Sequence, residues 1–171
     1  DSKRVTTEKN TIDTDTYKTL KIDKVDNSPI DNDALVYILK KIKSIKSDAI
    51  IFSDFRHGIF NKISINQFLK EIYKKKRTIK IADSQVASRW GNICDFSNFD
   101  LITPNEKEAR FSLADQDSNI SEITRQLSKK ANFKNLILKL SSRGIFVVSK
   151  DKAFSLPSFV NHCIDPVGAG D

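Results

Sequence analysis

From residue 48 onward, short apolar runs alternate with amphipathic segments, and this alternation restricts the fold more than any other feature. The apolar runs are typical of strands buried on both faces and lie at residues 48–53, 78–83, 99–103 and 135–140. The segments between them carry apolar residues at helical spacing and lie at residues 64–76, 105–113 and 120–131. Strands alternating with helices in this way predict crossover connections and an α/β fold with a mostly parallel sheet.

The two ends of the pattern differ from its middle. A turn at residues 141–144 separates the last parallel strand from residues 145–149, and residues 153–156 form a further edge piece. This arrangement predicts an antiparallel hairpin at the edge of the sheet. Residues 1–26 are polar with weak alternation, which predicts exposed strands with one solvated face.

Two helix starts carry capping residues. After the break at Pro29, we expect a helix capped by Asp31 or Asn32. We also expect Ser118 to cap the helix at 120–131.

Composition excludes several classes of protein. The chain has 171 residues, of which 39% are hydrophobic and 30% charged, so it can form one globular domain without metals or disulfides. Its longest apolar run, residues 34–39, is too short for a membrane span, and no signal peptide is recognisable. Cys94 and Cys163 lie far apart and outside any C-x-x-C spacing. These observations predict a soluble cytoplasmic protein with two reduced thiols and no contact with membranes.

The net charge of +7 is compatible with nucleic acid, with phosphorylated metabolites or with simple solubility. The excess consists mostly of lysines scattered over helical faces, without an arginine-rich stripe or an aromatic ladder. We therefore do not expect a nucleic-acid partner, although a basic nucleic-acid-binding domain stays open as a lesser alternative.

The strongest motif is DPVGAGD at residues 165–171. Gly168, Ala169 and Gly170 would let backbone amides converge on an oxyanion, and a helix beginning there would add attraction for phosphate. Asp171 follows directly, within reach of a group that attacks the phosphate. The alternative is a tight turn with Asp171 as the helix cap.

A second motif, TPNEKEAR, follows the strand at 99–103. Asn105 and Glu108 stand three residues apart, where an amide and a carboxylate can hold the hydration shell of Mg²⁺. The alternative is a capping box, in which both side chains bond the backbone of the first helical turn.

Two further acids follow strands. Asp54 and Asp83 end the first two apolar runs, and the crevice at the carboxyl ends of parallel strands is where α/β proteins bind ligands. Both are candidate substrate-side residues, with capping as the alternative.

Taken together, the NEKE and GAGD stretches resemble the PfkB (ribokinase-like) carbohydrate kinase family, which pairs P-N-x-x-E with D-T-x-G-A-G-D in this order. The resemblance extends to SDFRHG at residues 53–58, which is similar to the S-D-Y-x-K-G stretch of the heptose-phosphate kinases. It also includes TTEK at residues 6–9 and LKID at residues 20–23, which are similar to segments of their lid strands. The most similar members are the kinase domain of the bifunctional ADP-heptose synthase and sugar kinases of surface-polysaccharide synthesis.

The resemblance implies a ribokinase-like three-layer sandwich with a small β lid. Residues 1–26 would form lid strands that can clasp across a homodimer, and residues 27–171 the kinase core, with parts of the family's domain lying before and after this chain. The implied activity is transfer of a phosphoryl group from ATP to a hydroxyl of a sugar or sugar phosphate, with a heptose 7-phosphate as the leading expectation.

The resemblance also assigns residues. Asp171 matches the catalytic base, with the amides of Gly168, Ala169 and Gly170 stabilising the transferred phosphoryl group. Asn105 and Glu108 match the residues that place Mg²⁺. Residues near the nucleotide are expected to be Lys139, Ser141, Gly144 and Asp165.

Three positions depart from the family pattern. Pro166 replaces a threonine, Ser141 replaces a glycine, and His57 stands where the heptose-phosphate kinases usually have lysine. Pro166 and His57 motivate an alternative, a degenerate relative that binds or scaffolds without catalysis.

Overall fold

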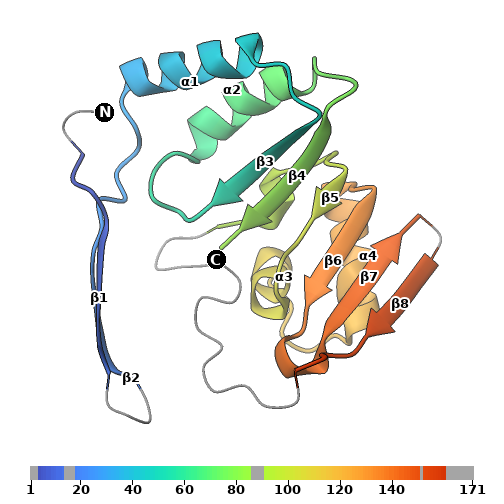
Figure 1. Cartoon of the computed structure of the whole chain (residues 1–171). Helices are drawn as coiled ribbons and strands as arrows, with labels where there is room; N and C mark the ends of the chain where they lie inside the picture. Colours follow the sequence, from blue (N-terminus) through green and yellow to red (C-terminus); the bar gives the residue numbers. More distant parts are fainter. Residues whose placement is uncertain (1–3, 14–17, 86–90, 151, 161–171) are drawn as a thin grey trace. The chain divides into compact units, whose positions relative to one another are not determined.

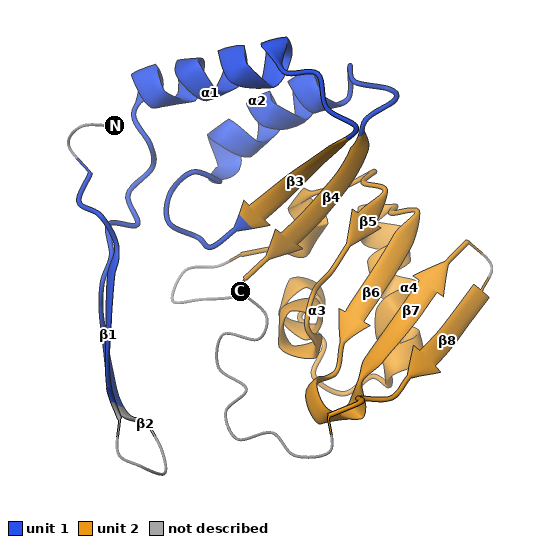
Figure 2. Cartoon of the chain, in the orientation of Figure 1, with its two compact units in different colours: residues 1–48, 54–78 blue, residues 49–53, 79–171 orange. Residues whose placement is uncertain are grey.

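The computed structural model describes residues 4–13, 18–85, 91–150 and 152–160. The chain divides into two compact units, shown in Figure 2. Unit 1 comprises residues 1–48 and 54–78, and unit 2 comprises residues 49–53 and 79–171. We describe each unit by itself.

Unit 2 is built on a six-stranded sheet with the order β3-β4-β5-β6-β7-β8. The strands are β3 (Ala49–Asp54), β4 (Ile79–Ser84), β5 (Leu101–Ile102), β6 (Asn135–Lys139), β7 (Ile145–Ser149) and β8 (Lys152–Leu156). Strands β4, β5 and β6 run parallel, and β3 points the same way in Figure 1. Strands β6, β7 and β8 are antiparallel. The predicted mostly parallel sheet with an antiparallel edge hairpin is thus confirmed.

Two helices, α3 (Glu106–Leu113) and α4 (Ile120–Ala131), lie on the same face of this sheet (Figure 1). The β6 residues Leu136 and Leu138 are fully buried, whereas their neighbours on the opposite face are only half-buried. Short 3₁₀ turns, η1 (Ile93–Asp95) and η2 (Ser141–Arg143), complete the unit. Its core also holds three phenylalanines in mutual edge-to-face contact, with ring centroids 5.5–5.8 Å apart: Phe52, Phe96 and Phe99.

Unit 1 contains the two-stranded antiparallel ribbon of β1 (Glu8–Asp13) and β2 (Lys18–Lys24), and the helices α1 (Asn32–Ser44) and α2 (Lys62–Ile72). Asp31 caps α1 by accepting a bond of 2.7 Å from the amide of Ala34, so of the two predicted caps Asp31 is the one used. The side chains of the ribbon are exposed wherever they are described, as the sequence predicts.

Two helix boundaries differ from the prediction. Helix α4 is capped by Asn119, whose side chain accepts from the amide of Glu122 at 2.9 Å, and not by Ser118. Helix α2 begins at Lys62, because Asn61 and Ser64 form a capping box that the sequence reading missed. It ends at Ile72 and not at residue 76, since the amides of Lys74 and Lys75 bond to carbonyls only three residues back and close the last turn.

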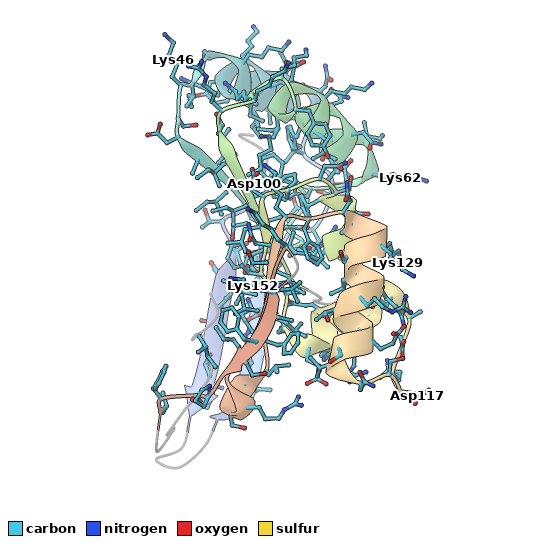
Figure 3. The ribbon with its side chains drawn as sticks, turned by 90° about the vertical axis from the view of Figure 1, so that its right-hand side faces the viewer. Lys46, Lys62, Asp100, Asp117, Lys129 and Lys152 are labelled. Carbon is cyan, nitrogen blue, oxygen red and sulfur yellow. The ribbon has the colours of Figure 1, made fainter. Side chains whose placement is uncertain are left out.

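The surface of both units is rich in lysine. Figure 3 labels three lysines at the outer edge of the helical elements, Lys46, Lys62 and Lys129. None of the helices in the described parts of the chain is long and apolar enough to span a membrane.

Candidate functional site

The glycine-rich motif lies outside the described residues. This applies to the predicted base Asp171, to its glycine nest Gly168, Ala169 and Gly170, and to Asp165. Their roles therefore stay predictions, and we build the site from the residues that the structure describes in unit 2.

Three side chains meet at the carboxyl edge of the sheet of unit 2. The Lys139 ammonium lies 3.1 Å from Oδ1 of Asp83, and the Thr103 hydroxyl donates to the same oxygen, also at 3.1 Å. Both charged side chains are partly exposed, at 32% for Lys139 and 25% for Asp83. The structure thus joins a predicted nucleotide-side residue to a predicted substrate-side residue in one hydrogen-bonded cluster.

The register of the parallel strands explains this meeting. Ile81 pairs with Leu101, and Leu101 pairs with Asn135, so the residues two positions further along each strand share one face. Asp83 and Thr103 lie on this face, opposite the one that buries Ala82, and Lys139 follows at the end of β6. The cluster therefore lies on the sheet face that points away from α3 and α4, at the edge where α/β sheets bind ligands.

Asn105 and Glu108 form the capping box that the sequence left open as an alternative. The Glu108 carboxylate accepts from the Asn105 backbone amide and from its side-chain amide, both at 2.7 Å, while Asn105 Oδ1 accepts from the Glu108 amide at 2.8 Å. Glu108 is 6% exposed. Direct ligation of a metal would have to replace these bonds, whereas Mg²⁺ readily keeps several of its waters. The pair therefore fits an ion held through water and not one held directly.

This helix start is tied to the end of β6. The Lys139 amide donates to the carbonyl of Pro104 at 2.9 Å, and Lys139 and Asn105 form an isolated parallel bridge. The segment at Asn105, predicted to hold the metal, and the segment at Lys139, predicted to lie near the nucleotide, are thereby joined by backbone contacts.

The turn after β6 has an unusual backbone. Gly144 has φ +85°, and a side chain there would meet the carbonyl oxygen of Leu156 at 2.0 Å, so only glycine fits. Ser141 has φ +56°, a left-handed conformation in which glycine is favoured. Ser141, which the resemblance matched to a glycine, thus has a glycine-like backbone conformation.

An ion-pair chain links this turn to α3. Glu106 accepts from Nε and Nη2 of Arg110 at 3.0 and 2.9 Å, and its other oxygen is paired with the Arg143 guanidinium. The sequence reading assigned no role to these residues or to Thr103. The signal for Thr103 is its place at a strand end beside Pro104, whereas the pairing of Glu106 with Arg143 has no local signal.

Asp54 belongs to unit 1 and is 2% exposed. Its carboxylate accepts from the Arg56 amide at 2.8 Å and forms an ion pair of 2.8 Å with the Arg56 side chain, so the loop after β3 already engages it. His57 is half-buried, and its Nδ1 lies 3.0 Å from Oδ1 of Asn27. A substrate role for Asp54 stays a prediction.

Other candidate chemistry is sparse in the described regions. Within residues 4–13, 18–85, 91–150 and 152–160, no three side chains of His, Cys, Asp or Glu gather to hold a metal ion. Cys94 is a free thiol, and burial raises its pKa from the ordinary 9.0 to about 11, opposed weakly by Lys130. A thiol with this pKa is a poor nucleophile at neutral pH.

Comparison with curated proteins finds relatives along the whole chain. The chain is 26% identical over 178 residues to the bifunctional protein HldE of Helicobacter pylori strain J99. This alignment covers all of the chain and 37% of the relative. It is 28% identical over 173 residues to the bifunctional protein HldE of Campylobacter jejuni subsp. doylei, at 98% and 36% coverage. The chain thus spans little more than a third of the length of these relatives.

Solved structures share the fold. Ribokinase from Giardia lamblia superposes with a TM-score of 0.73 at 14% identity, covering 98% of this chain and 52% of that one. A mutant of phosphofructokinase-2 from Escherichia coli gives a TM-score of 0.64 at 15% identity, covering 83% and 48%. The expected ribokinase-like fold is therefore confirmed. The family model for the pfkB family carbohydrate kinases matches residues 3–171, and we conclude that the chain belongs to this family.

Proposed function

We propose that this chain is the part of an ATP-dependent carbohydrate kinase that transfers a phosphoryl group to a hydroxyl of a sugar or sugar phosphate. The observation that carries the proposal is the match to the pfkB family over residues 3–171, a span that contains both the NEKE and the GAGD stretches. The carboxyl-edge cluster of Asp83, Thr103 and Lys139 supports it, because it gathers charged groups beside Asn105, the cap of α3.

Phosphoryl transfer needs positioning and charge neutralisation more than covalent chemistry. In this proposal Asp171 accepts the proton of the attacking hydroxyl, and the amides of Gly168–Gly170 bind the oxygens of the transferred group. The Lys139 ammonium lies at the strand end, where it can attract the phosphates of the nucleotide. Asp83 holds this ammonium in place, and the Thr103 hydroxyl donates to the same oxygen of Asp83.

A magnesium ion bound with ATP would neutralise charge on its phosphates. Asn105 and Glu108 are the residues that would hold it, through water, since the capping box already engages both side chains. The cap has a further effect, because it fixes the first turn of α3 and with it the position of the Glu108 carboxylate.

For the acceptor we propose a heptose 7-phosphate, phosphorylated at its anomeric hydroxyl. The similarity to the HldE proteins and the SDFRHG stretch support this choice. With His57 at the family's lysine position, we expect weaker contact with the phosphate of the sugar.

We further propose a homodimer formed through the β1–β2 ribbon. In the register of the ribbon, Ile12 faces Leu20, and Ile22 lies on the same face. All three are about half exposed, at 54%, 48% and 53%. An isolated two-stranded ribbon is marginally stable in water, so an apolar face of this kind favours a covering partner.

The test is Asp171→Asn in the natural-length protein, with Asp117→Asn on the exposed loop before α4 as the matched control. We expect Asp171→Asn to abolish ADP release that depends on sugar while ATP still binds, and the control to behave as the unchanged protein. Undiminished turnover in Asp171→Asn would refute the assignment of the base. A panel of heptose and hexose phosphates that gives no turnover with the unchanged protein would favour the non-catalytic alternative.

A further inference from the structure

Arg4 lies in unit 1, just before the ribbon, and binds the backbone of two distant segments. Its Nη1 donates to the carbonyl of Ser28 at 2.7 Å. Its Nη2 lies 2.7 Å from the carbonyl of Asp26, 2.9 Å from that of Ser28 and 2.6 Å from that of His57. One guanidinium thus joins the start of β1, the segment after β2 and the loop after β3.

These segments are packed without spare room. Gly58 has φ +91°, and a side chain there would meet the carbonyl oxygen of Ser28 at 1.8 Å and the Arg4 guanidinium at 2.6 Å. The Gly58 carbonyl accepts from the amide of Ile30 at 3.1 Å. The contact between His57 and Asn27 adds a side-chain link between the same two segments. We call residues 4, 26–30 and 54–58 the ribbon root.

The ribbon depends on this root for its orientation. The described side chains of β1 and β2 are exposed, so the ribbon gains little from burial against the rest of its own unit. Both of its strands enter the root, β1 four residues after Arg4 and β2 two residues before Asp26. Bonds at the root therefore decide where the ribbon points relative to the Asp54–Gly58 loop.

We propose that Arg4 is a positioning residue of the kinase, which ties the loop at residues 54–58 to the base of the ribbon and so holds His57 where it can contact the sugar phosphate. The inference rests on the proposed function, because it takes the loop at residues 54–58 as part of the sugar side of the site. Arg4 acts through the backbone that it holds and touches no substrate.

Arginine suits this task and lysine does not. The guanidinium is a planar fork whose donors reach several carbonyls at once, and its charge strengthens each bond. A lysine ammonium is a single point on a flexible stem and cannot span the Asp26 and Ser28 carbonyls and the His57 carbonyl in the same geometry. We therefore expect Arg4→Lys to behave like Arg4→Ala.

The kinetic test compares the two variants with the unchanged protein at natural length. We expect the KM for the sugar to rise about tenfold, equivalent to roughly 1.4 kcal/mol, with kcat and the KM for ATP within about twofold. Added guanidinium ion should partly reverse the rise in the KM for the sugar in Arg4→Ala. It should have no effect in Arg4→Lys, because the lysine side chain fills the space that the ion would occupy. The matched control is Arg125→Ala, since Arg125 forms an exposed ion pair with Glu122 on α4, far in sequence from the segments that Arg4 binds.

Hydrogen exchange tests whether Arg4 holds the ribbon to the loop at residues 54–58, and it does not require an active enzyme. In Arg4→Ala the amides of Ile30 and of residues 8–12 and 20–24 should exchange faster, while those of α4 stay unchanged. Unchanged exchange at the ribbon would overturn the proposal even if the enzyme is active. Faster exchange with an unaltered KM for the sugar would overturn the positioning role. If the unchanged protein phosphorylates no sugar, the proposed function fails, and exchange alone then decides whether Arg4 locks the ribbon.

Discussion

Replacement of Gly144 by alanine should destabilise unit 2 strongly, and the structure gives the reason. The glycine has φ +85° and ψ −133°, a conformation that is almost closed to residues with a side chain. An added Cβ would lie 2.0 Å from the carbonyl oxygen of Leu156, 2.6 Å from the carbonyl carbon of Pro157 and 2.7 Å from the amide nitrogen of Ser158. All three atoms belong to the backbone, so no side-chain rotation can relieve the contacts.

The magnitude follows from two contributions to the free energy of unfolding. The unfavourable backbone conformation costs a non-glycine residue about 1–3 kcal/mol. Displacing packed neighbours costs about another 1–3 kcal/mol. A central value of about 4 kcal/mol is a large part of the roughly 5–15 kcal/mol that stabilises a domain. For a chain of this size it lowers Tm by roughly 8–16 °C.

The assay is urea denaturation followed by circular dichroism, with Ser141→Gly as the control in the same turn. Ser141 has φ +56°, so a glycine there removes a strain of about 1–2 kcal/mol and adds about 0.5–1 kcal/mol of backbone entropy. We expect the control to be slightly more stable than the unchanged protein. A loss below about 1 kcal/mol in Gly144→Ala, or a clear loss in Ser141→Gly, would show that the turn geometry is misjudged.

Three further predictions concern unit 2. In a Cys163→Ser background, alkylation of Cys94 should stay slow at pH 8 and rise toward pH 11, because the raised pKa keeps the thiol protonated; a half-maximal rate near pH 9 in the folded protein would contradict this. Asn105→Ala should lower the free energy of unfolding by about 1 kcal/mol through loss of the cap of α3, as measured by urea denaturation, and an unchanged midpoint would argue against the capping box. A double-mutant cycle of Asp83→Asn and Lys139→Met should give a coupling of about 0.5–1 kcal/mol that shrinks at high salt, and strictly additive effects would show that the pair is not formed.

Much of the fold follows from local patterns in the sequence. The apolar runs predict the strands β3, β4 and β6, and the helical spacing predicts α3 and α4, because the period of a strand or helix is expressed over a few neighbouring residues. The boundaries were less accurate where capping decided them. The start of α2 depends on a cap formed by Asn61 and Ser64, and a serine at the third position is a weaker signal than glutamate.

Some residues of the candidate site also follow from local sequence, whereas others come together only in the fold. Asn105 and Glu108 were identified because their interaction spans three residues, although the sequence could not choose between a metal role and a cap. The cluster of Asp83, Thr103 and Lys139 joins residues that are 20 and 56 positions apart, and it exists because β4, β5 and β6 lie side by side in register.

The sequence by itself therefore determined the elements, the family and the motif residues, all of which depend on residue type and short spacing. Only the tertiary structure decided which strand ends meet and what Arg4 binds. The partners of Arg4 are backbone carbonyls of Asp26, Ser28 and His57. Every residue carries such a carbonyl, so their selection leaves no mark in the sequence and arises only when folding brings distant segments of the backbone together.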